Sequence, residues 1–249
     1  RLEIPYKRGW KRWHYITGLI FGVFLVWWSI SGIFSMSRVP QWIVPTKAEF
    51  TFNTSRLWGK GVLPLETYQL DYRKLQDVYP DLKKVDWVRF ADIPAYRIIE
   101  GENERYIDAS GTEVVALNVP QKTIEEGFRK IHGNDSKMTV TVLEKYDNYY
   151  LNLRRTLELP VYKVEFDDDD HNLYYVNPRD GYIRYLNKNK IVDKWLFSAI
   201  HYLNMGWLVN RPWLWTFCLW FLCIGCGIVC FTGVVLGVKT WLIRKKKKS

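Results

Sequence analysis

Two long stretches of the chain carry no charged side chain. The first runs from Tyr15 to Ser37 and the second from Pro212 to Val238. The hydrocarbon core of a bilayer is about 30 Å thick, and about 20 apolar residues in a helix are enough to cross it. We therefore predict two transmembrane helices, at 15–37 and 212–238, each of which crosses the membrane once.

Between these stretches, apolar and polar residues alternate in the manner of a soluble domain. Two segments share one order of elements, which is strand, polar turn, strand, tight turn ending in glycine, and further strand. They are Tyr96–Val114 and Tyr162–Ile183. The alternation predicts the strands, and the Ser-Gly and Asp-Gly pairs at Gly111 and Gly181 predict the tight turns. These segments indicate an internal repeat.

A helix is expected in front of each copy of the repeat, at Tyr68–Tyr79 and at Thr123–His132. Helices that pack on antiparallel sheets form an α+β arrangement. We assign the first repeat to 45–120 and the second to 121–190. The expected fold is therefore an α-helical membrane anchor that carries an α+β domain of two repeats.

The segment after the second repeat, 191–209, is predicted to be helical but is polar. Asp193, Lys194, His201 and Asn204 make it a poor membrane span. A third crossing would also place the C-terminal lysines outside, whereas basic flanks tend to stay in the cytoplasm. We therefore expect one interfacial helix that lies at, or dips into, the outer membrane surface.

The net charge of +10 comes from the two ends of the chain. Eleven basic residues lie in 1–14 and 239–249, where Glu3 is the only acidic residue, whereas 38–211 holds 25 basic and 25 acidic residues. Basic residues beside membrane spans stay on the cytoplasmic side. We expect a cytoplasmic lead-in at 1–14, a cytoplasmic tail at 239–249 and an exported domain between them. The lipid bilayer is the expected partner of these cations, and no nucleic-acid binding is expected.

All four cysteines lie in the second apolar stretch, so no disulfide is expected in the exported domain. Cys223 and Cys226 have the spacing of a metal-binding pair, but cysteine in an apolar helix is more commonly a packing residue. A face made of Cys226, Cys230, Gly233 and Gly237 is expected to pack closely against the first helix.

Six short motifs follow one another in a defined order along the chain. They are His14–Gly18, Ser31–Gly32, Tyr106–Gly111, Tyr175–Gly181, Leu196–His201 and Thr232–Gly233. In this order they resemble the opening helix, the two PepSY modules and the closing segment of PepSY-associated transmembrane proteins. The resemblance covers nearly the whole chain, and the order of the parts is more specific than any single motif.

The resemblance implies a bacterial inner-membrane protein with a periplasmic PepSY domain. The family is often linked to iron acquisition, and some longer members are haem-containing reductases of ferric siderophores, with histidines at helix ends as haem ligands. His14 and His201 occupy the corresponding positions and are the expected axial ligands of haem b. This chain differs from the longer members in having two spans, half of their helices, and fewer histidines.

His14 stands at the head of a strip of small residues on the first helix. At 100° per residue, His14, Gly18, Gly22, Ser29 and Gly32 fall within about 80° of one another. Such a strip would let a flat haem approach the helix, so Gly18 and Gly22 are expected to face the cofactor. The alternative is that these two glycines form a helix-packing face.

The charge pattern places the two histidines near opposite membrane surfaces. That separation is most of about 30 Å, whereas one haem iron holds its two axial nitrogens about 4 Å apart. His14 and His201 are therefore expected to bind separate haems, each with a further ligand. The ligand would come from the symmetry mate in a two-fold homodimer, or from a second membrane subunit. A scaffold without haem is the third possibility.

Other residues carry weaker signals. His132 is expected to be a helix-end residue, and Asp167–Asp170 with His171 to be a solvated turn rather than a cation site. No catalytic triad, zinc-ligand spacing or phosphate-binding loop is found. The tryptophans expected to receive a substrate, or else to anchor the core or the membrane interface, are Trp42, Trp58 and Trp87.

The sequence thus leads to one functional hypothesis and one alternative. The first is an inner-membrane protein that transfers electrons through haem and supports the reduction of ferric siderophores in the periplasm. The second is a non-catalytic accessory or scaffold subunit that uses the PepSY domain as a binding module. Whether the chain is an enzyme stays open, with haem-dependent ferric reductase as the candidate activity.

Overall fold

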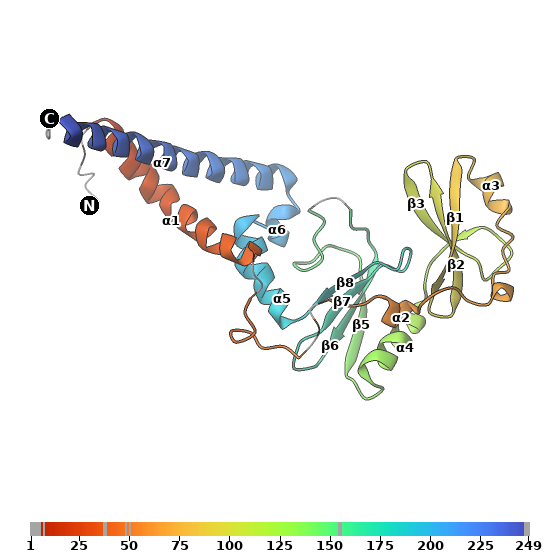
Figure 1. Ribbon diagram of the computed structural model, residues 1–249. Coiled ribbons are helices and arrows are strands. Elements are labelled where there is room, and N and C mark those ends of the chain that lie inside the picture. The colour runs from red at the N-terminus through yellow and green to blue at the C-terminus, as the bar shows by residue number, and fades with distance from the viewer. Residues whose placement is uncertain are drawn as a thin grey trace. The chain divides into compact units, whose positions relative to one another are not determined.

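The computed structural model divides the chain into two units, whose helices and strands are labelled in Figure 1. The first unit joins the two ends of the chain, Arg1–Ile43 and Lys190–Ser249, and the second unit is Val44–Asn189. Parts of the predicted lead-in and tail lie outside the described residues. The residues that the structure describes are 6, 8–36, 39–47, 49, 51–153 and 156–246.

Two long apolar helices form most of the first unit. Helix α1 extends over Trp10–Met36 and helix α7 over Pro212–Lys246, and both are long and apolar enough to cross a membrane. The two predicted transmembrane helices are therefore present as candidate spans. Helix α7 continues past the predicted end at Val238 because lysine and arginine are good helix formers, and their charges are favourable at a helix C-terminus.

Helices α1 and α7 lie side by side and run antiparallel (Figure 1). Near the start of α1, the ring of Trp10 lies 5.9 Å from that of Phe231, late in α7. Further along α1, Phe21 packs at Gly225, where a side chain would collide with the phenyl ring. Glycine at this position therefore allows the two helices to approach closely. The α7 residues buried with Phe21 are Leu222, Cys226 and Val229.

The predicted packing face of α7 is only partly correct. Cys226 is buried, but Cys230 is exposed. No described atom outside α7 lies within 4 Å of a Cβ placed at Gly237. The contact face is instead rotated toward Gly225, because the large ring of Phe21 requires a position without a side chain. Residue spacing alone does not show where the partner helix has its largest side chain.

The single helix predicted at 191–209 is wrong, since short helical segments and a break take its place. The break follows His201, and Leu203 has a φ of +51°, which a right-handed helix cannot contain. The carbonyl of Ser198 accepts from the amide of Tyr202 at 3.2 Å and from that of Asn204 at 3.1 Å. The segments are α5 (Lys188–Asp193), the π-helix η2 (Lys194–Ala199) and α6 (Gly206–Val209).

The second unit contains two four-stranded antiparallel sheets in which neighbours in sequence are neighbours in space. The first sheet consists of β1 (Leu82–Phe90), β2 (Ile93–Glu100), β3 (Asn103–Asp108) and β4 (Val115–Ala116). The second consists of β5 (Met138–Leu143), β6 (Val161–Phe166), β7 (Leu173–Val176) and β8 (Ile183–Leu186). The predicted internal repeat is therefore present as two sheets of the same topology, and β1 and β5 are the strands that were not predicted.

The helices in front of the two sheets differ. The second expected helix is present as α4 (Gln121–His132). Of the first, expected at Tyr68–Tyr79, only α3 (Lys74–Val78) is α-helical. The amides of Gln69 and Leu70 donate to the carbonyl of Ala109, at 2.8 and 3.3 Å. This backbone pairs with the turn after β3 and is therefore not available for a helix. A 3₁₀ turn, η1 (Leu65–Thr67), precedes it.

One apolar cluster combines residues of both repeats. Helix α4 lays Phe128 on the second sheet, with its ring 4.6 Å from that of Tyr174. The short helix α2 (Ser55–Trp58) adds the ring of Trp58, whose indole N–H donates to the carbonyl of Gly181 at 2.8 Å. Phe90 of β1 packs edge-on against the same indole, at 5.4 Å. The two repeats therefore depend on a shared core.

Candidate functional site

The first predicted site residue, His14, lies between α1 and α7. Its Nδ1 is 2.9 Å from the Oγ1 of Thr232. Its ring also lies against Gly233, where an added Cβ would come within 3.4 Å of the imidazole Cε1. The imidazole fits between the two helices because both residues that face it on α7 are small.

The hydroxyl of Thr232 fixes the direction of this hydrogen bond. It donates to its own helix, with Oγ1 at 2.8 Å from the carbonyl of Ile228 and 3.0 Å from that of Val229. A hydroxyl has one proton, so towards His14 the oxygen acts as an acceptor. His14 then carries its proton on Nδ1, and Nε2 of the neutral ring holds a lone pair. No described residue hydrogen-bonds to that Nε2.

The second predicted site residue, His201, lies outside α1 but makes the same kind of hydrogen bond, to a hydroxyl further along that helix. Its Nδ1 is 3.0 Å from the Oγ of Ser31. Ser31 is 1% exposed and donates to the carbonyl of Trp28 at 3.0 Å. The proton of His201 is therefore also on Nδ1. Aromatic rings flank the imidazole, Phe197 at 5.1 Å and Trp28 at 6.4 Å.

The two histidines belong to separate sites. His14 and Ser31, the partner of His201, lie on one continuous helix. At a rise of 1.5 Å per residue, these two positions are about 25 Å apart along its axis. One haem iron holds its axial nitrogens about 4 Å apart. A single iron therefore cannot bind both imidazoles, and the first unit contains no third histidine.

The small residues that follow His14 on α1 do not pack against another described part of the chain. A Cβ placed at Gly18, Gly22 or Gly32 would have no described neighbour within 4 Å. Gly18 and Gly22 therefore take no part in the contact between α1 and α7, which is made by Phe21 at Gly225, and a packing face toward another helix stays a prediction. The strip leaves an open surface on α1.

Sequence patterns did not identify the hydroxyl partners of the two histidines. Ser31-Gly32 and Thr232-Gly233 are visible only as motifs of the resemblance. A signal was present, because a hydroxyl residue inside an apolar helix bonds its own backbone and still offers an acceptor. Which imidazole it meets is set by tertiary structure.

Two of the three highlighted tryptophans are core residues. Trp58 is 7% exposed, and Trp87 packs edge-on against Tyr96, with ring centroids 5.4 Å apart. Trp58 cannot receive a substrate without opening the core, and Trp87 is partly buried against the core of the first sheet. Trp42 is 84% exposed and belongs to the first unit, not to the second.

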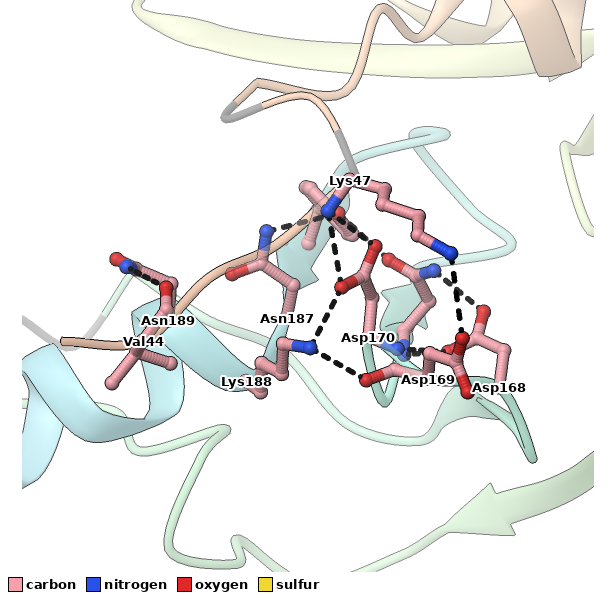
Figure 2. Close-up of polar contacts among 10 residues, drawn as sticks. Val44, Lys47, Asp168, Asp169, Asp170, Asn187, Lys188 and Asn189 are labelled. Atoms are coloured by element: carbon pink, nitrogen blue, oxygen red, sulfur yellow. Dashed lines mark hydrogen bonds and ion pairs between the residues drawn. The ribbon is translucent and has the colours of Figure 1, made fainter. Parts of the chain in front are cut away.

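The acidic hairpin Asp167–Asp170 directs its carboxylates to different partners, as Figure 2 shows for Asp168, Asp169 and Asp170. Asp167 and Asp169 form exposed ion pairs with Lys137 and Lys47, at 4.0 and 3.6 Å. Asp168 accepts from the side-chain amide of Asn172 at 2.6 Å. Among the described residues, no group of three or more His, Cys, Asp or Glu is placed to hold a metal ion. The hairpin is a structural turn.

The last aspartate of the hairpin, Asp170, is 7% exposed and fixes the place where the chain enters and leaves the second unit (Figure 2). It accepts from the amide of Lys47 at 3.0 and 3.2 Å, and the Nζ of Lys188 lies 3.2 Å away. Next to them, the side-chain amide of Asn189 donates to the carbonyl of Val44 at 3.0 Å. We call these five residues the neck.

We expect Asp170→Asn to destabilise the second unit, because it removes a buried charge that is hydrogen-bonded to a main-chain amide and paired with Lys188. The free energy of unfolding should fall by about 1–3 kcal/mol. Asp169→Asn is the matched control: this exposed carboxylate should contribute less than about 0.5 kcal/mol. Urea denaturation of the detergent-solubilised chain measures both. Equal effects of the two variants would contradict a structural role for Asp170.

No protein-family model, curated protein or solved structure matches this chain. What the chain does must be inferred from its own residues, above all from the two histidine sites on the apolar helices.

Proposed function

We propose that this chain is a haem-binding electron-transfer protein of the bacterial inner membrane that supports the reduction of ferric complexes, such as ferric siderophores, in the periplasm. One observation carries the proposal: both histidines of the helical unit use Nδ1 to bond a buried hydroxyl oxygen. Metal-bound histidines in proteins have this arrangement, in which the second ring nitrogen donates to a fixed acceptor and orients the ligand.

The residues at both positions fit a haem. His14 and His201 would each be one axial ligand of a separate haem b, through Nε2. Bound haem would supply a one-electron carrier at each site. The open surface at Gly18 and Gly22 leaves room for a flat macrocycle near His14. The rings of Phe197 and Trp28 beside His201 suit contact with the apolar face of a macrocycle. Thr232 and Ser31 would hold the two imidazoles in the ligating tautomer.

Each haem requires a second ligand from outside the chain. A two-fold homodimer supplies it if each histidine meets its symmetry mate near the axis. A second membrane subunit with its own histidines is the other source. In either case the two sites stay about 25 Å apart along the helices and provide two steps of an electron path across the bilayer.

The proposed orientation follows from the basic ends of the two helices. Lys239 near the end of α7 lies over the ring of Trp10 at the start of α1, 5.8 Å from its centroid. The described cations of both flanks thus belong to the same end of the antiparallel pair. Placing this end in the cytoplasm satisfies the preference of basic residues for that side. The second unit is then periplasmic.

An absorption spectrum of the purified chain tests the proposal. The full-length protein, expressed with excess haem and solubilised in mild detergent, should show a Soret band that sharpens and shifts on reduction. A homodimer with two haems gives one haem per chain in a pyridine haemochrome assay. A colourless protein would overturn the proposal.

The accessory subunit is the second candidate function. It is favoured by the fact that each end of the helix pair has one histidine, so that the chain cannot complete a bis-histidine site alone. Co-purification of a partner membrane protein, without haem on this chain, would identify this role.

A further inference from the structure

A cavity of about 330 Å³ opens on the second unit. It is independent of the two histidine sites, because none of its residues belongs to the helical unit. Ligand pockets in proteins start at about 300 Å³, so the cavity has room for a molecule with a single ring. The residues of its wall that matter here are Phe52, Arg56, His132, Asn172, Tyr174 and Tyr185.

The wall of the cavity is largely aromatic. The rings of Tyr174 and Tyr185 are stacked, with centroids 4.9 Å apart and planes inclined by 22°. Phe52 meets Tyr174 edge-on at 5.0 Å. Both tyrosines are buried among neighbouring side chains, so their positions are fixed before a ligand arrives. Flat rings gain from such offset or edge-on contacts.

The side chains of Tyr174, Tyr185, Asn172 and His132 in this wall already have hydrogen-bond partners. The hydroxyl of Tyr185 donates to the Oδ1 of Asn172 at 2.7 Å, and the hydroxyl of Tyr174 lies 3.0 Å from the Nε2 of His132. The imidazole is stacked on Phe166 at 4.1 Å. Burial lowers the pKa of His132, so the ring is neutral at pH 7. These four side chains therefore bring no net charge to the cavity.

Arg56 is the uncompensated cation of the cavity. Its guanidinium forms no hydrogen bond or ion pair with a described residue, and only its main-chain amide is bonded, to the carbonyl of Asn53. Burial lowers the pKa of His132, and the charge of Arg56 lowers it further. The positive charge of Arg56 therefore reaches the imidazole of His132 in the wall of the cavity. By contrast, the charge of Asp170 is balanced by Lys188 at 3.2 Å, and Lys47 at the rim is paired with Asp169.

Glu49 also lines the cavity. Burial raises the pKa of Tyr185 to about 12, and the negative charge of Glu49 contributes to that rise. Glu49 is an acceptor with no described hydrogen-bond partner in this structure. The cavity thus contains one cation, Arg56, whose charge influences Tyr174 and His132. It also contains one anion, Glu49, whose charge influences Tyr185.

We propose that the cavity binds a small planar aromatic carboxylate that also bears a hydrogen-bond donor. Arg56 binds the carboxylate through its forked N–H groups, the tyrosine pair packs the ring, and Glu49 accepts from the donor. One uncompensated guanidinium matches one carboxylate charge, whereas a phosphate dianion would need a second free cation.

Calorimetric titration of the full-length protein in detergent with 4-aminobenzoate tests the proposal. The expected result is saturable binding, weakened at least about tenfold by Arg56→Gln, because a charge-assisted pair is lost. Arg56→Lys should weaken it less, since the charge remains but the fork is lost. Arg105→Gln is the matched control: it removes the same charge from the first repeat, where Arg105 pairs with Glu100, and should leave binding unchanged.

Two further ligands separate the parts of the proposed contact. Aniline lacks the carboxylate and should not bind measurably, and benzoate lacks the donor and should bind more weakly than 4-aminobenzoate. Absence of binding by 4-aminobenzoate at millimolar concentration overturns the proposal. So does equal binding by aniline, or binding that Arg56→Gln does not change while that variant keeps the wild-type unfolding midpoint.

Discussion

His201→Ala is expected to halve the haem content of the purified protein, and His14→Ala is expected to do the same. In the proposed function, each substitution removes one haem ligand from one of two sites that lie about 25 Å apart along α1, so neither should affect the other site. The double variant should contain no haem. The haem-to-protein ratio from the pyridine haemochrome assay, together with the height of the Soret band, measures all three.

His171→Asn is the control for these variants. His171 lies in the acidic hairpin of the second unit, and its φ of +48° is tolerated by asparagine. Haem content should therefore stay at the wild-type value. Complete loss of haem from either single variant would contradict two independent sites. Full retention of haem in both single variants would show that neither histidine is a ligand.

The elements that could be predicted from the sequence are those whose pattern is local. An uninterrupted apolar stretch predicts α1 and α7, because an apolar run of that length is typical of a helix long enough to cross a bilayer. Alternation gives the last three strands of each repeat. β1 was not predicted because it is an edge strand that carries charged residues such as Lys83 and Lys84 on its exposed positions, which edge strands accept. β5 was not predicted either, although Thr and Val alternate in it.

The errors arise where distant residues decide the backbone. The expected helix at 68–79 loses its first half because the amides of Gln69 and Leu70 bond Ala109, some forty residues away. The expected helix at 191–209 breaks around Leu203, where the carbonyl of Ser198 accepts hydrogen bonds from the amides of both Tyr202 and Asn204. No local pattern reports such competing acceptors, so propensity alone favours a continuous helix.

The same limit applies to the candidate site. The positions of His14 and His201 were predicted, and the structure places them far apart, but their partners lie 218 and 170 positions away in the sequence. The tautomer follows only once it is known that Thr232 and Ser31 donate to their own helix. The cavity in the second unit was missed because its wall comes from α2, α4, β7 and β8 together.

Gly181→Ala is expected to destabilise the second unit by about 2–4 kcal/mol. Gly181 has a φ of +68°, where an alanine is strained, and an added Cβ would collide with Phe90 and lie 3.1 Å from the indole nitrogen of Trp58. Left-handed backbone costs about 1–2 kcal/mol, and an overpacked core costs about 1–3 kcal/mol. The indole of Trp58 also donates to the carbonyl of Gly181, so the collision disturbs this bond.

Gly111→Ala is the matched control, because Gly111 ends the corresponding turn of the first repeat. A Cβ at Gly111 would meet no described atom within 4 Å. The φ of Gly111 is not positive, so the backbone does not require glycine there. The free energy of unfolding should change by less than about 0.5 kcal/mol. Urea denaturation, followed by tryptophan fluorescence, compares the two variants in the full-length protein.

Because Phe90 belongs to the first sheet and Gly181 to the second repeat, Gly181→Ala should lower the unfolding midpoint of the whole second unit in a single transition. Two separate transitions, with only one of them shifted, would show that the repeats fold independently and do not share a core.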